Sequence, residues 1–217
     1  MSSSPTTPIL AHQFEDATQQ RDAATIGMWL FIATEILFFG GMFLGYTVYR
    51  YTYPQAFAEG SQHTLIWFGG TNAAVLLISS TTMALAVHAA SENRRALLVS
   101  LLLGTASLGA LFLVIKGFEY AHEVKENLLP GSSFHIVAAE PLKAEMFFYI
   151  YWLMTGFHAL HVAIGVVLIL IFAARAFFTN AFVNHDTPVD LLGLYWHFVD
   201  IVWVFLFPLL YLVDRHS

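Results

Sequence analysis

Five ionisable residues lie near the middle of long apolar stretches of this sequence. Two are acids and three are histidines: Glu35, His158, His161, His197 and Asp200. A charged side chain at the centre of a membrane helix costs about 2.5 to 3.5 kcal/mol on an insertion scale, so ionisable residues there are candidates for function. Carboxyls exchange protons, whereas imidazoles exchange protons or bind metals. These five residues are therefore the candidate functional residues of the chain.

Glu35 stands in the segment ATEILFFGG, far from any other charged residue in the sequence. In an apolar surrounding a carboxyl is more stable neutral than charged. A neutral carboxyl can exchange a proton with a chain of water molecules, or it can hydrogen-bond a neighbouring helix. A glutamine would make the same hydrogen bond without the risk of ionisation, so both interpretations stay open.

The histidines occur in two short motifs. His158 and His161 are three residues apart in TGFHALHV, a spacing that places them on one helix face. His197 has the same spacing from Asp200 in YWHFVDIVW, so the carboxyl could orient an imidazole as outer carboxylates do at metal sites. Haem or copper ligation is one interpretation. We favour a structural network of interhelical hydrogen bonds, and we predict no metal on this chain.

One fragment of a di-iron motif is also present. Glu119 and His122 form a single Glu-x-x-His element, whereas a carboxylate-bridged di-iron site needs two such elements and two further carboxylates. The chain contains no cysteine, which excludes disulfides and thiolate ligation of zinc or iron–sulfur clusters by its own residues. The single fragment therefore does not predict a metal site.

The candidate residues must be positioned by helices that cross a membrane. Of 217 residues, 58% are hydrophobic and 11% are charged, whereas a soluble domain carries about 25% charged residues. Five apolar stretches each exceed the roughly 20 residues that a spanning helix needs, and none alternates as barrel strands do. We predict an all-α fold, an integral membrane bundle of five transmembrane helices at about residues 24–51, 65–89, 96–118, 146–174 and 191–213.

The remaining segments set the domain organisation. Residues 1–23 are polar and lack the basic start and apolar core of a signal peptide, so we expect a flexible tail before a single transmembrane domain at residues 24–217. The net charge of −6 argues against a nucleic-acid partner. Lys and Arg are balanced between the two sides, and only the pair Arg94 and Arg95 favours an N-terminus inside.

Several segments together resemble the third subunit of haem-copper terminal oxidases, in a short five-helix form. The resemblance runs from Gly27 to Leu212 and rests on the segments GMWLFIATEILFFGGMFLGY, TNAAVLLISSTTMALAVHAA, KGFEYAHEV, TGFHALHVAIG and YWHFVDIVWVFLFPLLYL. The combination of TGFHALHV with YWHFVDIVW is highly specific. The longer form of the family has seven spans, and this sequence begins where the third of them would begin.

The resemblance implies an accessory subunit of a proton-pumping oxidase, with cytochrome c as the preferred electron donor. It implies that Glu35 helps to sustain proton uptake, and that the haems and copper belong to partner subunits. The implied partners are subunit I in direct contact, subunit II, further small or supercomplex subunits, and bound phospholipid. The implied location is the bacterial inner (plasma) membrane, with the N-terminus cytoplasmic and the C-terminus periplasmic or external.

Arg175, in FAARAFF, matches a basic position of the family that could face a lipid phosphate. An ordinary interfacial arginine is an equally good interpretation. Three other functions remain open at this stage: subunit III of a quinol oxidase, the related accessory protein of nitric oxide reductase, and a self-contained membrane cytochrome with haem between histidines. A proton-coupled transporter is disfavoured, because the chain shows neither internal repeats nor interrupted helices.

Overall fold

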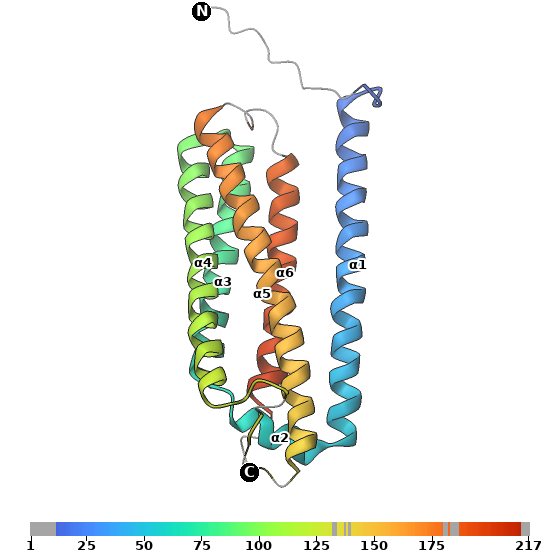
Figure 1. Cartoon of the computed structure of the whole chain (residues 1–217). Coiled ribbons are helices and arrows are strands. Elements are labelled where there is room, and N and C mark those ends of the chain that lie inside the picture. The colour runs from blue at the N-terminus through green and yellow to red at the C-terminus, as the bar shows by residue number, and fades with distance from the viewer. Residues whose placement is uncertain are drawn as a thin grey trace, which may run out of the picture.

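The computed structural model describes residues 12–131, 134–136, 138, 140–179, 182 and 187–213. Within these ranges the chain is all-helical, and five of its helices are long and apolar enough to cross a membrane. They run alternately down and up, so that α1 starts and α6 ends at opposite ends of the molecule (Figure 1). The helices are α1 (Ala17–Thr52), α2 (Pro54–Gln62), α3 (Ile66–Ser91), α4 (Arg95–Lys125), α5 (Pro141–Phe178) and α6 (Thr187–Tyr211).

The prediction of five membrane-spanning helices is confirmed, with differences at the ends. Helix α1 begins at Ala17, where the sequence predicted a tail up to residue 23, because the Asp16 side chain accepts a hydrogen bond from the Gln19 amide and caps the helix. Residues 1–11 of that predicted tail lie outside the described residues. Helix α2 was not predicted, since its nine residues have no run of apolar residues long enough to signal a span.

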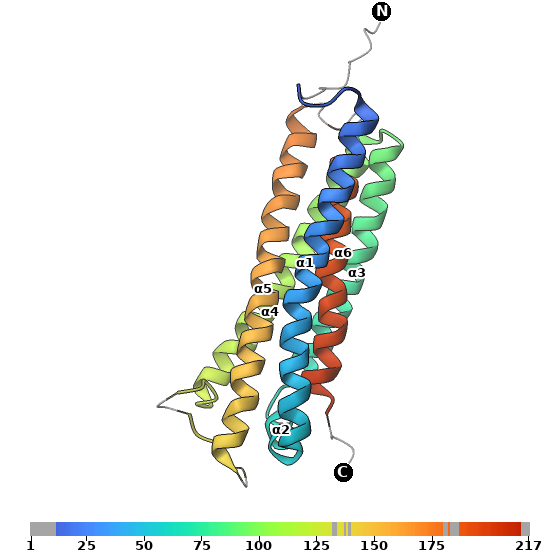
Figure 2. The same ribbon diagram turned by 90° about the vertical axis from the view of Figure 1, so that its right-hand side faces the viewer.

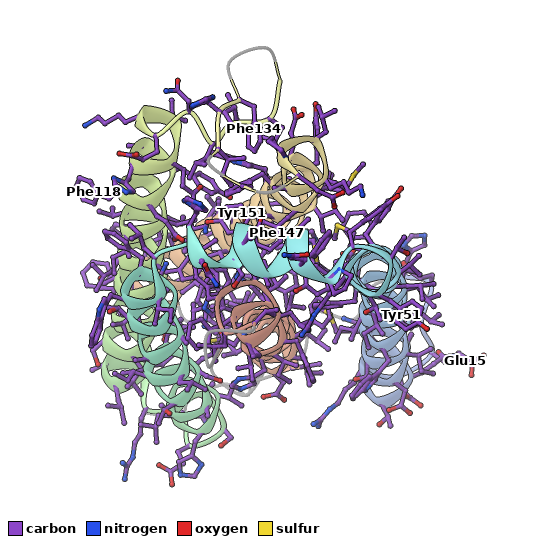
Figure 3. All side chains as sticks on the ribbon, turned by 90° about the horizontal axis from the view of Figure 1, so that it is seen from below. Glu15, Tyr51, Phe118, Phe134, Phe147 and Tyr151 are labelled. Atoms are coloured by element: carbon purple, nitrogen blue, oxygen red, sulfur yellow. The ribbon has the colours of Figure 1, made fainter. Side chains whose placement is uncertain are left out.

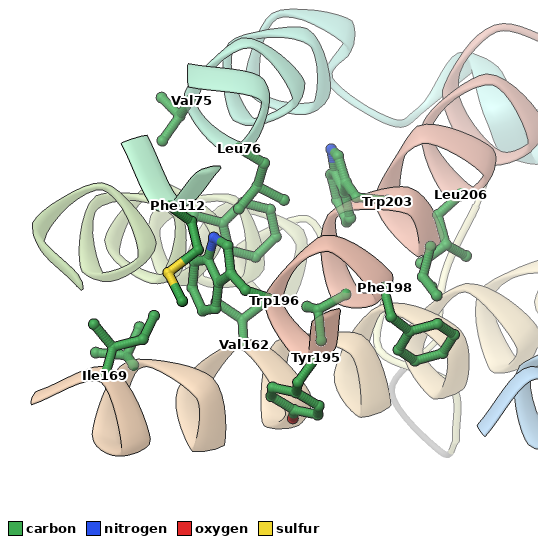
Figure 4. Close-up of a cluster of buried hydrophobic side chains, with 14 of the residues drawn as sticks. Val75, Leu76, Phe112, Val162, Ile169, Tyr195, Trp196, Phe198, Trp203 and Leu206 are labelled. Atoms are coloured by element: carbon green, nitrogen blue, oxygen red, sulfur yellow. The ribbon is translucent and has the colours of Figure 1, made fainter. Parts of the chain in front are cut away.

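Helices α3, α4, α5 and α6 form a tight bundle around two tryptophans of α6. Trp196 and Trp203 are fully buried, and their rings lie among side chains of the neighbouring helices (Figure 4). The Trp196 indole N–H donates to Ser79 Oγ on α3 at 2.7 Å. The α3–α4 hairpin that the short connection predicted is present, and a hydrogen bond of 2.8 Å joins Thr82 to Thr105 across it.

Helix α1 stands beside this bundle and packs against it with few side chains (Figures 1 and 2). Its buried residues are Ile32, Phe39 and Tyr46, which recur every seven residues and form one narrow stripe. Helix α2 then crosses the end of the bundle, as the view from below shows (Figure 3). Its Phe57 is fully buried and contacts the rings of Tyr46 and Phe147.

Close approach of α5 to Trp196 requires a glycine at position 165. A Cβ atom at Gly165 would lie 2.7 Å from the indole Cζ3 of Trp196, whereas a Cβ atom at Gly156 on the same helix would meet nothing within 4 Å. The contact distance at Gly165 is shorter than packed carbon atoms allow. The packing of α5 against α6 therefore depends on the absence of a side chain at this position.

We expect Gly165→Val to destabilise the chain by about 1 to 3 kcal/mol, because a buried ring must shift to admit the added carbons. The measurement is the midpoint temperature of thermal unfolding in detergent. The matched control is Gly156→Val on the same helix, which changes the residue type identically without meeting a neighbour. Equal losses in the two variants would contradict the packing explanation.

Candidate functional site

The clearest polar contact at mid-membrane depth joins Glu35 of α1 to His161 of α5. The distance from Glu35 Oε2 to His161 Nε2 is 3.0 Å, and the side chains are 18% and 14% exposed. The other imidazole nitrogen, Nδ1, lies 2.8 Å from the Phe157 carbonyl oxygen one turn earlier. The carbonyl oxygen of His161 in turn accepts the Tyr195 hydroxyl of α6 at 2.9 Å. Glu35 is therefore held by a histidine whose ring is fixed at both nitrogens.

This geometry fixes where one proton must be. A carbonyl oxygen only accepts, so His161 Nδ1 carries a hydrogen and donates it. A charged Glu35 and a neutral imidazole would then bring two acceptors together at Nε2. The 3.0 Å contact is a hydrogen bond only if a proton lies between Oε2 and Nε2. The pair is either a neutral acid with a neutral imidazole or a carboxylate with an imidazolium, and in both cases it holds one exchangeable proton.

The pair faces a groove between α1 and the bundle. The groove has a volume of about 630 Å³, and its lining combines Glu35 and His161 with mostly apolar side chains of α1, α5 and α6. A second groove, of about 680 Å³, runs along the other side of α1 against α6 and includes His197. Both exist because α1 touches the bundle along one stripe only. The proton pair is thus open to whatever fills the first groove.

His197 and Asp200 are linked through a serine of α3. Ser80 Oγ lies 2.7 Å from His197 Nδ1, and the same hydroxyl lies beside the Asp200 carboxyl. Asp200 is 3% exposed, and its two oxygens have no hydrogen-bond partner among the described residues. Ser80, rather than Asp200, is thus the observed partner of the His197 ring.

His158 has a different surrounding from His161, although the two share a motif. It is fully buried between the rings of Phe112 and Trp203, at centroid distances of 5.4 and 5.1 Å. Neither of its ring nitrogens has a partner among the described residues. The three mid-span histidines therefore occupy three separate environments. Within the described ranges no group of three or more His, Cys, Asp or Glu side chains is close enough to hold a metal ion.

A cluster of charged and phenolic groups lies near the end of α4, and the sequence analysis did not identify it. Lys116 is 1% exposed, and its ammonium donates to Glu119 Oε2 at 3.0 Å and to the hydroxyls of Tyr151 and Tyr211 at 2.7 Å each. Glu123, one turn beyond Glu119, forms a hydrogen bond with the Tyr151 hydroxyl, at 2.5 Å from its Oε1. Tyr151 is labelled in the view from below, next to α2 (Figure 3). The cluster joins α4, α5 and α6.

The spacing of the three charged residues was a usable signal. Positions 116, 119 and 123 fall on one helix face. In a sequence without known partners, however, a Lys and two Glu on one face are usually interpreted as a solvated surface. The two residues of the single Glu-x-x-His fragment lie in different surroundings, because Glu119 is buried and His122 is exposed. Arg175, the predicted lipid-phosphate residue, lies exposed in the last turn of α5.

Comparison with known proteins decides the family. Residues 11–214 match the family described as cytochrome c oxidase subunit III. The chain belongs to the cytochrome c oxidase subunit III family. It is accordingly an accessory subunit of a haem-copper terminal oxidase.

Three relatives show the range of the family. A cytochrome c oxidase subunit 3 from Synechocystis sp. is 32% identical over 88% of this chain and 76% of its own length. A cytochrome bo(3) ubiquinol oxidase subunit 3 from Pseudomonas aeruginosa is 26% identical over 94% of this chain and 91% of its own length. A haem-copper oxidase subunit I+III from Aeropyrum pernix is 31% identical over 89% of this chain, which covers 23% of that longer protein. In the last relative, subunit III is part of the same polypeptide as subunit I.

We expect Lys116→Met to destabilise this subunit III by about 3 to 5 kcal/mol, because it leaves the buried Glu119 carboxylate without its cation. The matched control is Lys143→Met, which removes a Lys–Glu pair of the same three-residue spacing whose side chains are 42% and 53% exposed. A pair exposed to that extent contributes about 0 to 1 kcal/mol. The midpoint temperature of unfolding measures the loss in both variants. Similar small shifts in the two variants would contradict a stabilising role for the buried cluster.

Proposed function

We propose that this subunit III sustains proton uptake by its oxidase through the proton that Glu35 and His161 share. One observation carries the proposal: the 3.0 Å contact requires a proton between the two groups, and the pair lines a groove instead of being sealed in the core. A group that holds a proton within reach of a groove can pass it on and be reloaded. A purely structural hydrogen bond would be better protected inside the bundle.

We propose subunit I of the oxidase as the direct partner and subunit II as a further member of the complex. The relative from Aeropyrum pernix, named as subunit I+III, supports the first contact because its two parts are joined in one chain. Small or supercomplex subunits would extend the assembly. The haems and copper then reside on these partners, and subunit III supports the proton uptake that their chemistry requires.

We propose cytochrome c as the electron donor of the complex. The match to the cytochrome c oxidase subunit III family and the relative from Synechocystis sp. support this choice. The relative from Pseudomonas aeruginosa, named as a ubiquinol oxidase subunit, makes quinol the second candidate. The donor binds other subunits, so the composition of the purified complex distinguishes the two.

We propose phospholipid as the occupant of the larger groove, which lies between α1 and α6. The α1 part of the larger groove extends from Trp29 to Phe43, which is about 21 Å of helix at roughly 1.5 Å per residue. Its lining is almost entirely apolar, which suits an acyl chain. The exposed position of Arg175 at the end of the spanning helix α5 supports a role in binding the phosphate group of a lipid.

We propose that the protein resides in a bacterial inner membrane with the N-terminus on the cytoplasmic side and the C-terminus outside. The turn between α3 and α4, which carries Arg94 and Arg95, lies at the same end of the molecule as the start of α1 (Figure 1). An amine reagent that does not cross membranes should label the exposed Lys125 at the other end when added to intact cells. Labelling only after lysis would indicate the opposite orientation, with Lys125 on the cytoplasmic side.

We expect Glu35→Gln to leave assembly intact and to reduce proton uptake over repeated turnovers. Glutamine can donate to His161 Nε2, so the contact is preserved, but it carries no exchangeable acidic proton. The measurement is the ratio of protons taken up to oxygen reduced in vesicles, followed until the enzyme inactivates. Glu126→Gln, an exposed acid at the end of α4, is the control. Uptake and inactivation kinetics equal to those of the control would reduce Glu35 to a packing residue.

We expect the chain to co-purify in mild detergent with a large haem-bearing chain and with a chain that contains a Cys-x-x-x-Cys copper site. Native mass spectrometry of the same preparation should show retained phospholipid. An intense Soret and α band in the reduced-minus-oxidised spectrum of the chain purified alone would contradict the accessory role and favour a self-contained cytochrome. A complex without the copper chain would favour the quinol alternative.

A further inference from the structure

The buried cluster near the end of α4 contains one carboxyl more than its cation can balance. Lys116 carries one positive charge and forms its ion pair with Glu119. Glu123 is 1% exposed, its Oε2 has no hydrogen-bond partner among the described residues, and no ammonium or guanidinium forms an ion pair with it there. A buried carboxylate without a partner cation costs several kcal/mol. The cluster is therefore electrically unbalanced if both of its glutamates are ionised.

The hydrogen-bond geometry also requires one more proton than the cluster holds when both glutamates are ionised. The three protons of Lys116 go to Glu119 Oε2 and to the hydroxyls of Tyr151 and Tyr211. The Tyr211 hydroxyl donates to Glu119 Oε1 at 2.6 Å. The Tyr151 hydroxyl has a single proton, yet it lies 2.5 Å from Glu123 Oε1 and 3.0 Å from Glu119 Oε1. With both acids ionised, one of these two short contacts has no hydrogen in it.

A proton on Glu123 removes both defects. Glu123 then donates from Oε1 to the Tyr151 oxygen, and the Tyr151 hydroxyl donates to Glu119 Oε1. The Tyr151 oxygen accepts from Glu123 and from Lys116, which uses its two lone pairs. Every contact of 3.0 Å or less among Lys116, the two glutamates and the two phenols then contains a proton, and the net charge is zero. Glu123 Oε2 becomes a neutral carbonyl oxygen, which is far less costly to leave unpaired than a charged one.

We propose that Glu123 is a proton-binding site of this subunit, occupied at neutral pH and separate from the Glu35–His161 pair. The groups that face it are Lys116, Glu119 and Tyr120 on its own helix, Tyr151 on α5, and Tyr211 on α6 through Tyr151. Release of the proton turns the Tyr151 hydroxyl from Glu119 toward Glu123. The contact that joins α4 to α5 and α6 therefore has two hydrogen-bonded arrangements that differ by one proton.

The test is infrared difference spectroscopy on the purified complex that contains the chain. A protonated carboxylic acid has a C=O stretching band well separated from carboxylate bands, and the band moves to lower frequency in D₂O. At neutral pH the wild-type spectrum minus that of Glu123→Gln should contain this acid band. The exposed Glu126→Gln is the control, and its difference spectrum should contain carboxylate bands in place of the acid band.

A second variant tests the charge balance itself. Glu119→Gln removes the ion-pair partner of Lys116, so Glu123 should ionise to balance the lysine, and the acid band should disappear without any change at position 123. Glu123→Gln should assemble with its complex as the wild type does, because glutamine is neutral. Failure of that assembly, an absent acid band in the wild type, or an acid band that persists in Glu119→Gln would each overturn the proposal.

Discussion

Hydrocarbon offers no hydrogen bonds, so a polar group inside a spanning helix must find its partner within the protein or on a neighbouring subunit. The bundle of this subunit III is organised by that constraint. The indole of Trp196 meets Ser79, Thr82 meets Thr105, and the ammonium of Lys116 meets a carboxylate and two phenols. Apart from the Lys116–Glu119 pair within α4, each contact joins different helices, so the polar groups fix the register of apolar surfaces that would otherwise slide past one another. The apolar packing around the tryptophans then fills the space between these contacts.

Helix α1 obeys the same constraint with fewer contacts. Its buried stripe is narrow, and its polar attachments are the Glu35–His161 pair and the bond from the Tyr46 hydroxyl to the Leu209 carbonyl. Loose packing of this kind leaves grooves on both sides of the helix. A proton-holding pair at such an interface is positioned for exchange, whereas the same pair in the bundle core would be inert.

The two carboxyls of interest therefore differ in access. Glu35 is half-buried beside a groove, and its partner histidine can take the proton. Glu123 is sealed, and its neighbours are phenols and a lysine already paired with Glu119. The Glu35–His161 pair and Glu123 each hold a proton, because an apolar surrounding penalises unbalanced charge. Because Glu35 has access to exchange partners, it suits proton exchange during turnover. Because Glu123 lacks that access, it suits a slower adjustment of helix contacts.

The sequence by itself determined the five spans and the family, and it identified Glu35 as a candidate functional residue, because hydrophobic length and rare mid-span charges are local properties. It did not determine which helix would meet each polar face. His158 and His161 are three residues apart and so point about 60° apart around the helix axis, which is enough for one to face the aromatic core and the other α1. Lys116, Glu119 and Glu123 were visible on one face, but only the position of Tyr151 and Tyr211 made that face a buried cluster. Side-chain partners across helices depend on the rotation and register of whole elements, and these are decided by packing in three dimensions.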